Sequence, residues 1–394
     1  MKYCIVIPDG AADFALNKLD GRTPLETARI PNMDRAAREG LLGEVKTVPK
    51  REEPGSDVAI LSVLGYDPEK YYTGRAPLEA ADLGVELESQ EWGFRCNFIT
   101  TDGSKMGDFC AGHISTEEAN VLIEELNNEL GTDAVHFYTG MSYRHLMTYN
   151  PAGMLSIKTT PPHQAMGEPL VDILPTGGGS KQLVYLMERS REILENHEIN
   201  EVRRDLGQNP ANMIWLWGEG QKPQMEDFDE KYGGKGAAIS AVNLVRGIAR
   251  LIGWDIIEVP GITGFTDTDY NAKGRYAIDA LEKYDIVLVH IEASDEASHN
   301  SDVRAKVQAI EKVDQEIVGP LMSLTDENDN LRLMILPDHY TSVEQGRHLR
   351  GAVPVAMWGA GIEAISKLPF SEAYAEQTEV RWDRGHELMR SFLH

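Results

Sequence analysis

The sequence predicts an α/β protein: a mostly parallel sheet flanked by helices, with a smaller inserted α+β domain. Continuous apolar runs of strand length alternate with longer amphipathic segments in the first and last parts of the chain, as a parallel sheet with crossover helices requires. Between these parts lie short strands, one helix and dense glycine and proline. The 394 residues suffice for two domains. We therefore expect a core of residues 1–87 and 176–394 and an insertion of residues 88–175.

Composition restricts the class of partner. The 38 Lys and Arg against 63 Asp and Glu give a net charge of −25, which argues against nucleic acid or an anionic membrane as partner. A phosphate site on such a chain needs locally concentrated positive charge, such as metal ions. The cysteines Cys4, Cys96 and Cys110 form no CxxC pair, as expected in a reducing compartment. The first apolar run is too short for a signal peptide and no run reaches membrane-spanning length, so a cytoplasmic protein is expected, with a homo-oligomer left open.

The first predicted strand is Tyr3–Ile7, which ends at Pro8-Asp9-Gly10. Asp9 would then lie at the carboxyl end of a buried strand, where open α/β sheets bind ligands, although a turn aspartate before glycine is an equal alternative. A helix is expected over 31–40, and a second begins at Ser56 after Pro54-Gly55. Ser56 alone is best explained as a helix cap. The functional alternative is a nucleophile at a helix N-terminus, which favours a phosphate on its oxygen.

The insertion is expected to contain strands at Phe94–Thr100 and Leu146–Tyr149 and a helix over Thr116–Leu130, with hinges near 84–90 and 174–180. The Gly177–Gly179 run lacks the GxxxxGK[ST] spacing of a nucleotide loop, so a hinge is the better interpretation. Core elements then follow at 181–197 (helix), 213–217 (strand), 237–252 (helix), 256–259 (strand), 271–283 (helix), 285–291 (strand), 302–317 (helix), 333–337 (strand) and 353–358 (strand).

Polar metal-binding side chains follow the late strands. Asp295 and His299 are four residues apart, so on a helix they share one face; taken alone, a capping aspartate and a surface histidine would explain them. Asp338-His339 directly follows an apolar strand, and His348 comes nine residues after His339. Together with Asp9 these are three carboxylates and three imidazoles, which suit two divalent ions of the Mn or Zn kind, with Mg left open. Paired metals and an activated serine, Ser56, indicate phosphoryl transfer.

In this order, the motifs resemble those of the archaeal-type cofactor-independent phosphoglycerate mutase family of the alkaline phosphatase superfamily. The resemblance covers nearly the whole chain and rests on Pro8-Asp9-Gly10, Pro54-Gly55-Ser56-Asp57, Tyr72-Thr73-Gly74-Arg75, Phe94-Arg95-Cys96-Asn97-Phe98, Thr263–Tyr270, Asp295–His299, Asp338-His339 and His348. It implies an alkaline-phosphatase-like core. It also implies that Asp9, Ser56, Asp338 and His339 hold one metal and that Asp295, His299 and His348 hold the other. Ser56 would carry the phosphoryl group between the two hydroxyls of phosphoglycerate without a bisphosphoglycerate primer.

Three positions depart from the family pattern. Ile60 replaces a histidine, Asp108–His113 replaces an arginine-rich stretch, and Trp217 replaces an arginine. Guanidinium groups suit a carboxylate and a phosphate, so these departures resemble the branch proposed to act as homoserine kinase. A mutase is the first hypothesis and a kinase passing phosphate from ATP to homoserine is the alternative. A phosphatase and a non-catalytic binding protein are less favoured.

The substrate is thus expected to be a small phosphorylated metabolite or an amino acid. Candidate substrate contacts are Arg75, His113, Arg144 and His163, most of them in the insertion. The insertion would act as a substrate-binding lid that excludes water from a phosphoserine.

Overall fold

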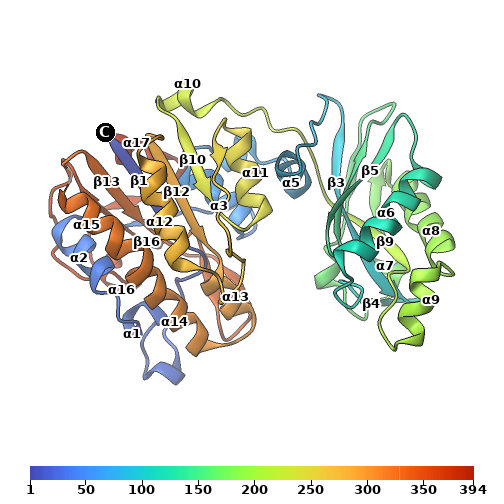
Figure 1. Ribbon diagram of the computed structural model, residues 1–394, viewed down its shortest axis with the longest axis horizontal. Coiled ribbons are helices and arrows are strands. Elements are labelled where there is room, and N and C mark those ends of the chain that lie inside the picture. The colour runs from blue at the N-terminus through green and yellow to red at the C-terminus, as the bar shows by residue number, and fades with distance from the viewer. Residues whose placement is uncertain (328) are drawn as a thin grey trace. The chain divides into compact units, whose positions relative to one another are not determined.

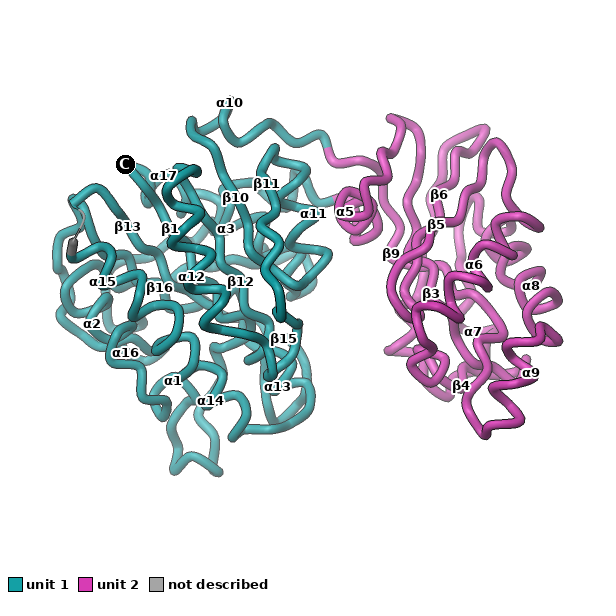
Figure 2. The backbone as a smooth tube through the Cα atoms, in the orientation of Figure 1, with its two compact units in different colours: residues 1–72, 224–394 teal, residues 73–223 magenta. Residues whose placement is uncertain are grey.

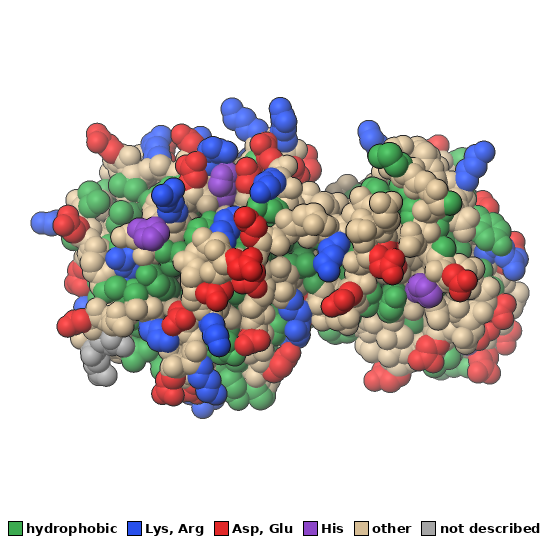
Figure 3. Space-filling view, turned by 90° about the horizontal axis from the view of Figure 1, so that it is seen from above, with side chains coloured by type: hydrophobic (Ala, Val, Ile, Leu, Met, Phe, Trp, Pro, Cys, Tyr) green, Lys and Arg blue, Asp and Glu red, His purple; other side chains and the backbone are tan. Residues whose placement is uncertain are grey.

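An eight-stranded sheet is the centre of the larger of two compact units in the computed structural model, which describes residues 1–327 and 329–394. Unit 1 comprises residues 1–72 and 224–394, and unit 2 comprises residues 73–223 (Figure 2). Figure 3 shows acidic side chains scattered over the face in view rather than gathered in one patch. Among the described residues, no helix combines the length and the hydrophobicity needed to cross a bilayer.

The sheet of unit 1 has the strand order β11-β10-β12-β1-β13-β16-β2-β17 (Figure 1). Its strands are β1 (Lys2–Pro8), β2 (Leu41–Val45), β10 (Gly236–Ile239), β11 (Asp255–Ile256), β12 (Ile286–Ile291), β13 (Leu331–Ile335), β16 (Val353–Gly359) and β17 (Arg381–Trp382). Five of the seven strand pairs are parallel and the two pairs of β16 are antiparallel. The predicted mostly parallel α/β sheet is therefore confirmed.

Helices cover the sheet of unit 1. They are α1 (Pro24–Thr27), α2 (Pro31–Glu39), α3 (Ser56–Val63), α4 (Pro68–Tyr71), α10 (Phe228–Tyr232), α11 (Asn243–Leu251), α12 (Tyr270–Leu281), α13 (Ala293–His299), α14 (Val303–Val313), α15 (Gly319–Glu327), α16 (Glu372–Glu376) and α17 (Leu388–Leu393). A short hairpin, β14 (Tyr340–Ser342) with β15 (Arg347–Leu349), completes this unit.

The strands at the centre of the sheet are buried on both faces, which explains their continuous hydrophobicity. Cys4 and Val6 of β1 belong to the core formed with α2, α12, α14 and α15. Tyr3 alternates with Cys4 and lies on the opposite face, where its ring contacts Phe392 of α17 at 5.4 Å. Helices α12 and α15 also contact strands of this sheet (Figure 1). This two-sided packing fixes the register of β1 and therefore the position of the residues that follow it.

Unit 2 is built on a second, antiparallel sheet. Strand β3 (Trp92–Thr101) pairs with β4 (Met106–Asp108), β6 (Arg144–Tyr149) and β9 (Met213–Gln221), and β5 (Val135–Met141) pairs with β6. The unit also contains β7 (Ser156–Lys158), β8 (Thr176–Gly178), α5 (Arg75–Asp82), α6 (Thr116–Leu130), α7 (Leu170–Ile173), α8 (Ser180–Leu194) and α9 (Glu198–Asp205). Its own core includes Phe94, Leu122 and Trp215.

The unit boundaries differ from the predicted insertion of residues 88–175. Strand β9 pairs with β3 over nearly its whole length, and α8 packs on β9, so residues 176–223 lie in unit 2 and not in the core. At the other end, α5 also packs on β3 and β9, which places residues 73–87 in unit 2. The pairing of two strands more than 100 residues apart has no local sequence signal.

One core element was also predicted wrongly. Residues 237–252 were expected to form a helix, but β10 (Gly236–Ile239) is a strand paired with β12 and β11, and only α11 (Asn243–Leu251) is helical. A short apolar run cannot be assigned to strand or helix by periodicity alone.

Candidate functional site

The predicted metal-binding residues meet at one edge of the unit 1 sheet. Strands β12, β1 and β13 are adjacent and parallel, so their carboxyl ends lie at the same edge. Asp9 follows β1, Asp295 lies in α13 just after β12, and Asp338 follows β13. His348 reaches the same edge because the β14–β15 hairpin pairs it with Thr341. The ligand atoms form two groups, Asp9–Asp338–His339 and Asp295–His299–His348, each with its atoms within 4.8 Å of one another.

In the first group, each carboxylate has one oxygen held by the protein and one without a hydrogen-bond partner. Asp338 Oδ1 accepts the backbone N–H groups of Gly10 (3.1 Å) and His339 (2.9 Å). Asp9 Oδ2 is 3.0 Å from His290 Nε2. The remaining oxygens, Asp9 Oδ1 and Asp338 Oδ2, are buried and have no hydrogen-bond partner, yet they lie 3.6 and 3.3 Å from His339 Nε2. Two unsatisfied buried anionic atoms facing one imidazole nitrogen fit a bound cation.

The second group has the spacing of ligands around one ion. His299 Nε2 lies 3.0 Å from His348 Nε2 and 3.2 Å from Asp295 Oδ2, and His348 Nε2 lies 3.4 Å from Asp295 Oδ1. Ligands about 2.0–2.2 Å from a tetrahedral ion are roughly 3.3–3.6 Å apart, so the ligand atoms of these three residues are close to that arrangement. Asp295 is not a helix cap, as one alternative held, because it lies inside α13, whose N-cap position is Glu292.

Backbone acceptors determine which histidine nitrogens can bind metal. His299 Nδ1 lies 2.8 Å from the Gly346 carbonyl and His348 Nδ1 lies 3.1 Å from the Pro54 carbonyl. A carbonyl only accepts, so each Nδ1 carries a proton and donates it. In the neutral rings both Nε2 atoms then present lone pairs toward each other at 3.0 Å, an arrangement that a cation between them satisfies. Such outer partners orient metal-binding histidines in general.

Thr341 connects the two groups. Its hydroxyl Oγ1 donates to Asp295 Oδ1 at 2.6 Å. His339 Nδ1 lies 3.1 Å from Thr341 Oγ1. Since the hydroxyl proton is directed at the carboxylate, His339 Nδ1–H donates to Thr341 and His339 Nε2 keeps its lone pair. The rings of His339 and His348 also contact each other, with centroids 4.2 Å apart. One buried threonine therefore sets the tautomer of a ligand in one group while anchoring a carboxylate of the other.

Ser56 lies at the first group and does not act as a helix cap. It is the first residue of α3, whose N-cap is Gly55. Its Oγ is 3.2 Å from Asp9 Oδ2 and 3.2 Å from His339 Nε2. The hydroxyl thus lies at the positive end of the helix dipole and beside candidate metal ligands.

Gly10 allows the approach of the two groups. Its φ is +59°, and a Cβ at this position would lie 2.5 Å from Thr341 Oγ1 and 2.6 Å from Asp295 Oδ1. Any side chain at this position would therefore push the carboxyl end of β1 away from Asp295.

Charge at this edge requires compensation. Burial, and then repulsion from Asp338 and Asp295, raise the pKa of Asp9 well above its usual value. Burial raises the pKa of Asp295, but His299 and His348 in their protonated form donate hydrogen bonds to it and bring its pKa well below its usual value. Burial lowers the pKa of His290 to about 4, so this ring is neutral and supplies no positive charge. Buried carboxylates without paired cations are costly, and divalent metal ions at these residues would supply the missing charge.

A buried ion pair supports the hairpin that carries Thr341. Lys306 Nζ lies 3.1 Å from Asp13 Oδ2 and donates to the Thr341 carbonyl at 2.7 Å, and both charged side chains are fully buried. Asp13 Oδ2 also accepts the Val343 N–H at 3.0 Å. Glu372 in turn accepts the Asp13 N–H at 3.0 Å.

The four predicted substrate contacts all belong to unit 2, and the structure connects them. Arg75 is the first residue of α5, Arg144 the first of β6, and His163 lies in a short 3-10 turn (Pro162–Gln164). A series of ring contacts runs from His113 to Tyr143 (6.0 Å), Tyr143 to Phe109 (6.1 Å), Phe109 to His163 (6.5 Å) and His163 to Trp217 (5.6 Å). We call these five rings the aromatic cluster.

Two arginines lie over rings of the aromatic cluster. Arg95 stacks over Trp217 at 4.2 Å and pairs with Glu79 at 3.0 Å, and Arg144 lies over Tyr143 at 5.4 Å. Burial lowers the pKa of Arg95, and the neighbouring charges of Arg75 and Arg144 lower it further. Arg95 pairs with Glu79 and lies near the charges of Arg75 and Arg144, so this part of unit 2 gathers guanidinium groups, which suit an anionic ligand.

Sequence reasoning missed two residues at the candidate metal site, His290 and Thr341. It also missed two at the aromatic cluster, Arg95 and Trp217. His290 interrupts the apolar strand β12, and a lone buried histidine at a strand end was an available signal. Thr341 carried none, because its role depends on the pairing of β14 with β15. Trp217 was considered only as a departure from an arginine.

A family model described as 2,3-bisphosphoglycerate-independent phosphoglycerate mutase matches residues 37–200. The chain is 45% identical over 394 residues to "2,3-bisphosphoglycerate-independent phosphoglycerate mutase 2" of Methanothermobacter thermautotrophicus, covering 100% of this chain and 97% of the relative. It is also 45% identical to the corresponding mutase of Methanothrix thermoacetophila, covering 100% of both chains.

Solved structures share the fold. A protein of Pyrococcus horikoshii aligns with a TM-score of 0.83 and 29% identity, covering 100% of this chain and 96% of that chain. The cofactor-independent phosphoglycerate mutase of Thermoplasma acidophilum aligns with a TM-score of 0.68 and 26% identity, covering 100% and 99%.

Proposed function

The chain belongs to the 2,3-bisphosphoglycerate-independent phosphoglycerate mutase family, and from this premise we propose that it interconverts 3- and 2-phosphoglycerate through a phosphoserine. The observation that carries the proposal is the position of Ser56. Its Oγ is 3.2 Å from both Asp9 and His339, at the start of α3 and among candidate metal ligands.

Two divalent ions are proposed, of the Mn or Zn kind or Mg. Asp9, Ser56, Asp338 and His339 would hold one, and Asp295, His299 and His348 the other. The spacing of the Nε2 and carboxylate atoms supports this division. When bound, such ions neutralise the phosphoryl oxygens and lower the pKa of a serine hydroxyl.

The residues of the chain account for the transfer as two displacements. Ser56 Oγ attacks the phosphorus of 3-phosphoglycerate; the new Oγ–P bond forms, the bond from phosphorus to O3 breaks, and O3 takes up a proton. The glycerate then turns within the closed site, its O2 attacks the phosphorus, and Ser56 is released. Ser56 Oγ loses its proton in the first step and regains one in the second, in which the O2 hydroxyl loses its proton, so protons and phosphoryl groups balance over the cycle.

Unit 2 is proposed to bind the substrate and to exclude water, because a phosphoserine exposed to water would hydrolyse. Arg75, Arg144, His113 and His163 are the proposed contacts, and Arg95 joins them from the structure. The concentration of guanidinium groups beside the aromatic cluster supports an anionic substrate. Guanidinium groups bind carboxylates and phosphates in a two-point geometry.

The test is mutase activity of the Mn-loaded protein on 3-phosphoglycerate, without bisphosphoglycerate, with Ser56→Ala as the variant. Conversion should fall to background while most of the metal remains bound, because three other ligands of its group are intact. Ser62→Ala is the matched control: Ser62 lies in the same helix, is buried and has an Oγ without a partner. Transfer at the wild-type rate by Ser56→Ala would refute the nucleophile.

The same preparation tests the alternative function. Incubation with ATP and homoserine should give no phosphohomoserine if the chain is a mutase. A product formed there, and none from 3-phosphoglycerate, would favour the kinase. Free phosphate from 3-phosphoglycerate without isomerisation would favour a phosphatase.

A further inference from the structure

A loop of unit 2 is held in an unusual backbone conformation. Three consecutive residues between β4 and α6 have positive φ: Ala111 (+49°), Gly112 (+64°) and His113 (+51°). Glycine adopts this region freely, but alanine and histidine have a Cβ that disfavours it. Such conformations persist where surrounding groups hold them, often at functional sites.

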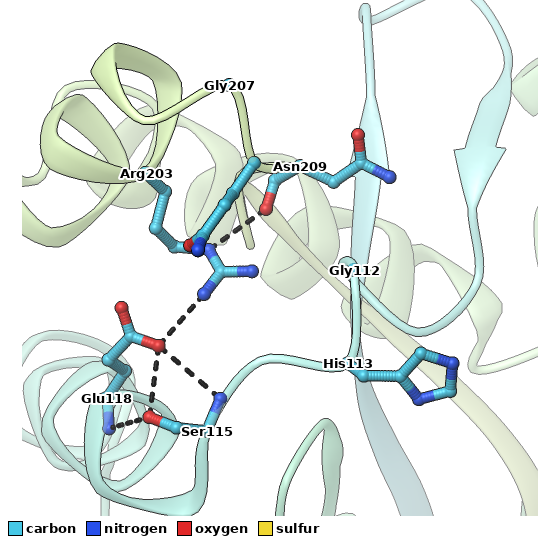
Figure 4. A pocket seen from close by; sticks show the side chains of 8 residues that line it. Gly112, His113, Ser115, Glu118, Arg203, Gly207 and Asn209 are labelled. Atoms are coloured by element: carbon cyan, nitrogen blue, oxygen red, sulfur yellow. Dashed lines mark hydrogen bonds and ion pairs between the residues drawn. The ribbon is translucent and has the colours of Figure 1, made fainter.

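Arg203 of α9 is one of the groups that hold this loop. Its side chain is 4% exposed, and its guanidinium contacts different parts of unit 2, including Asn209 and Glu118 (Figure 4). It donates to the Ala111 carbonyl at 2.8 Å, to the Asn209 carbonyl at 2.9 Å and to Glu118 Oε2 at 2.8 Å. The planar guanidinium of Arg203 therefore connects the Ala111 carbonyl to α9 and, through Glu118, to α6.

Asp108 holds the amide side of the same loop. Its Oδ1 accepts the Cys110 N–H at 2.9 Å, and its Oδ2 accepts the Gly112 N–H at 2.7 Å. Asn209 Nδ2 also donates to Asp108 Oδ2 at 2.7 Å. Arg203 and Asp108 thus fix opposite polar groups of the loop and share Asn209.

The result of this conformation is the placement of His113. Its ring is exposed and points away from the Arg203 side chain (Figure 4). It contacts Tyr143, which Arg144 overlies. Among the described residues, no hydrogen bond engages the His113 ring, so both nitrogens remain available to a ligand.

We propose that Arg203 is a positioning residue, which fixes the 108–113 loop in the left-handed conformation that presents His113 to an anionic group of the substrate. The inference rests on the proposed function, in which His113 contacts substrate. Each of the three guanidinium nitrogens of Arg203 donates to an acceptor within unit 2, so its role is to hold the loop. The competing explanation is that Arg203 only stabilises unit 2.

A double-mutant cycle separates the two explanations. Arg203→Lys keeps the charge but loses the fork, so the loop is released and kcat/KM should fall by about tenfold to a hundredfold, mainly through a higher KM. In a His113→Ala background the same change should cost nothing further, because the two residues act through one contact. Arg204→Lys, the exposed neighbour on α9, is the matched control and should leave kcat/KM unchanged. Equal losses in both backgrounds would overturn the proposal, as would no loss from His113→Ala alone.

A second readout does not depend on activity. The Cys110 thiol is 6% exposed and its Sγ donates to Asp108 Oδ1 at 3.0 Å, whereas Cys4 and Cys96 are fully buried. Labelling by a thiol reagent, located by peptide mass spectrometry, should accelerate at Cys110 alone in Arg203→Lys. Unchanged Cys110 labelling in that variant would overturn the proposal.

Failure to fold is handled by a second variant. If Arg203→Lys does not fold, Asp108→Asn releases the same loop from its amide side and is subject to the same two readouts. Absence of mutase activity in the wild-type protein would refute the proposed function but not the role of the loop. The role of the loop would then be tested by whether 3-phosphoglycerate protects Cys110 from labelling. Absence of that protection together with absent activity would overturn both.

Discussion

Replacing Thr341 by valine removes one hydroxyl from the metal centre and keeps the shape of the side chain. The buried hydroxyl donates to Asp295 at 2.6 Å and lies 3.1 Å from His339 Nδ1. Without it, Asp295 Oδ1 loses the hydrogen bond that it accepts from this hydroxyl, and the proton of His339 is no longer held on Nδ1. The Nε2 atom, which faces Ser56, then carries the proton in a larger share of molecules and cannot bind metal.

The size of the effect follows from these two losses. A hydrogen bond to a charged group contributes about 1.5–3 kcal/mol, and loss of an outer partner of a metal ligand weakens affinity by about 10- to 100-fold. That range corresponds to about 1.4–2.7 kcal/mol. Because Thr341 contacts one ligand of each group, both metal sites should weaken rather than one.

The assay is titration of the metal-free protein with Mn²⁺, followed by the signal of the free ion in electron paramagnetic resonance. Thr341→Val should raise both dissociation constants and leave the number of sites unchanged. Thr325→Val is the matched control, because Thr325 is also buried but donates to the Leu321 carbonyl of its own helix at 2.8 Å. Unchanged dissociation constants in Thr341→Val would refute the role of this hydroxyl.

Two further predictions concern buried charges near the hairpin. Burial raises the pKa of Glu372 to about 7 from 4.5, so the folded state binds a proton that the unfolded state releases at lower pH. Stability should therefore fall by up to about 3 kcal/mol as pH rises from 4.5 to 7, and urea unfolding should show this decline in the wild type but not in Glu372→Gln. Lys306→Met leaves Asp13 buried without its cation and should lower the free energy of unfolding by about 3–5 kcal/mol. Lys46→Met, at an exposed pair with Asp383, should change it by less than about 1 kcal/mol.

Each of these two predictions has a result that would contradict it. An equal pH dependence in wild type and Glu372→Gln would show that this carboxyl titrates normally in the folded state. A loss from Lys306→Met no larger than that from Lys46→Met would show that the buried pair adds nothing to the stability of the hairpin.

The clustering of the candidate metal-binding residues could be anticipated from the sequence because several of them follow elements with a strong local signal. Asp9 and Asp338 end apolar strands, and adjacent parallel strands bring such ends together regardless of the chain between them. The division of ligands came from the family resemblance, and the distances around His299 and His339 are consistent with it. Thr341 and Lys306 could not be predicted, because their roles depend on how a hairpin packs against α14 and the first loop.

The insertion shows the opposite case. Strands β3 and β6 were predicted as short strands of the insertion, but the extent of the insertion was not predicted. Strand β9 reads as a core strand by composition, and only its pairing with β3 assigns it to unit 2. The β10 segment was misassigned for a related reason, since four apolar residues carry no period.

The pairing of β3 with β9 also brings the entry and the exit of the insertion together. Thr73 Oγ1 donates to the Gln221 carbonyl at 2.5 Å, so the chain leaves and rejoins at neighbouring points of unit 2. Residues 73–223 therefore form a cassette that recombination can exchange as one piece. If unit 2 binds the substrate as we propose, exchange of this segment would change the substrate while the proposed metal ligands, which all belong to unit 1, stay in place.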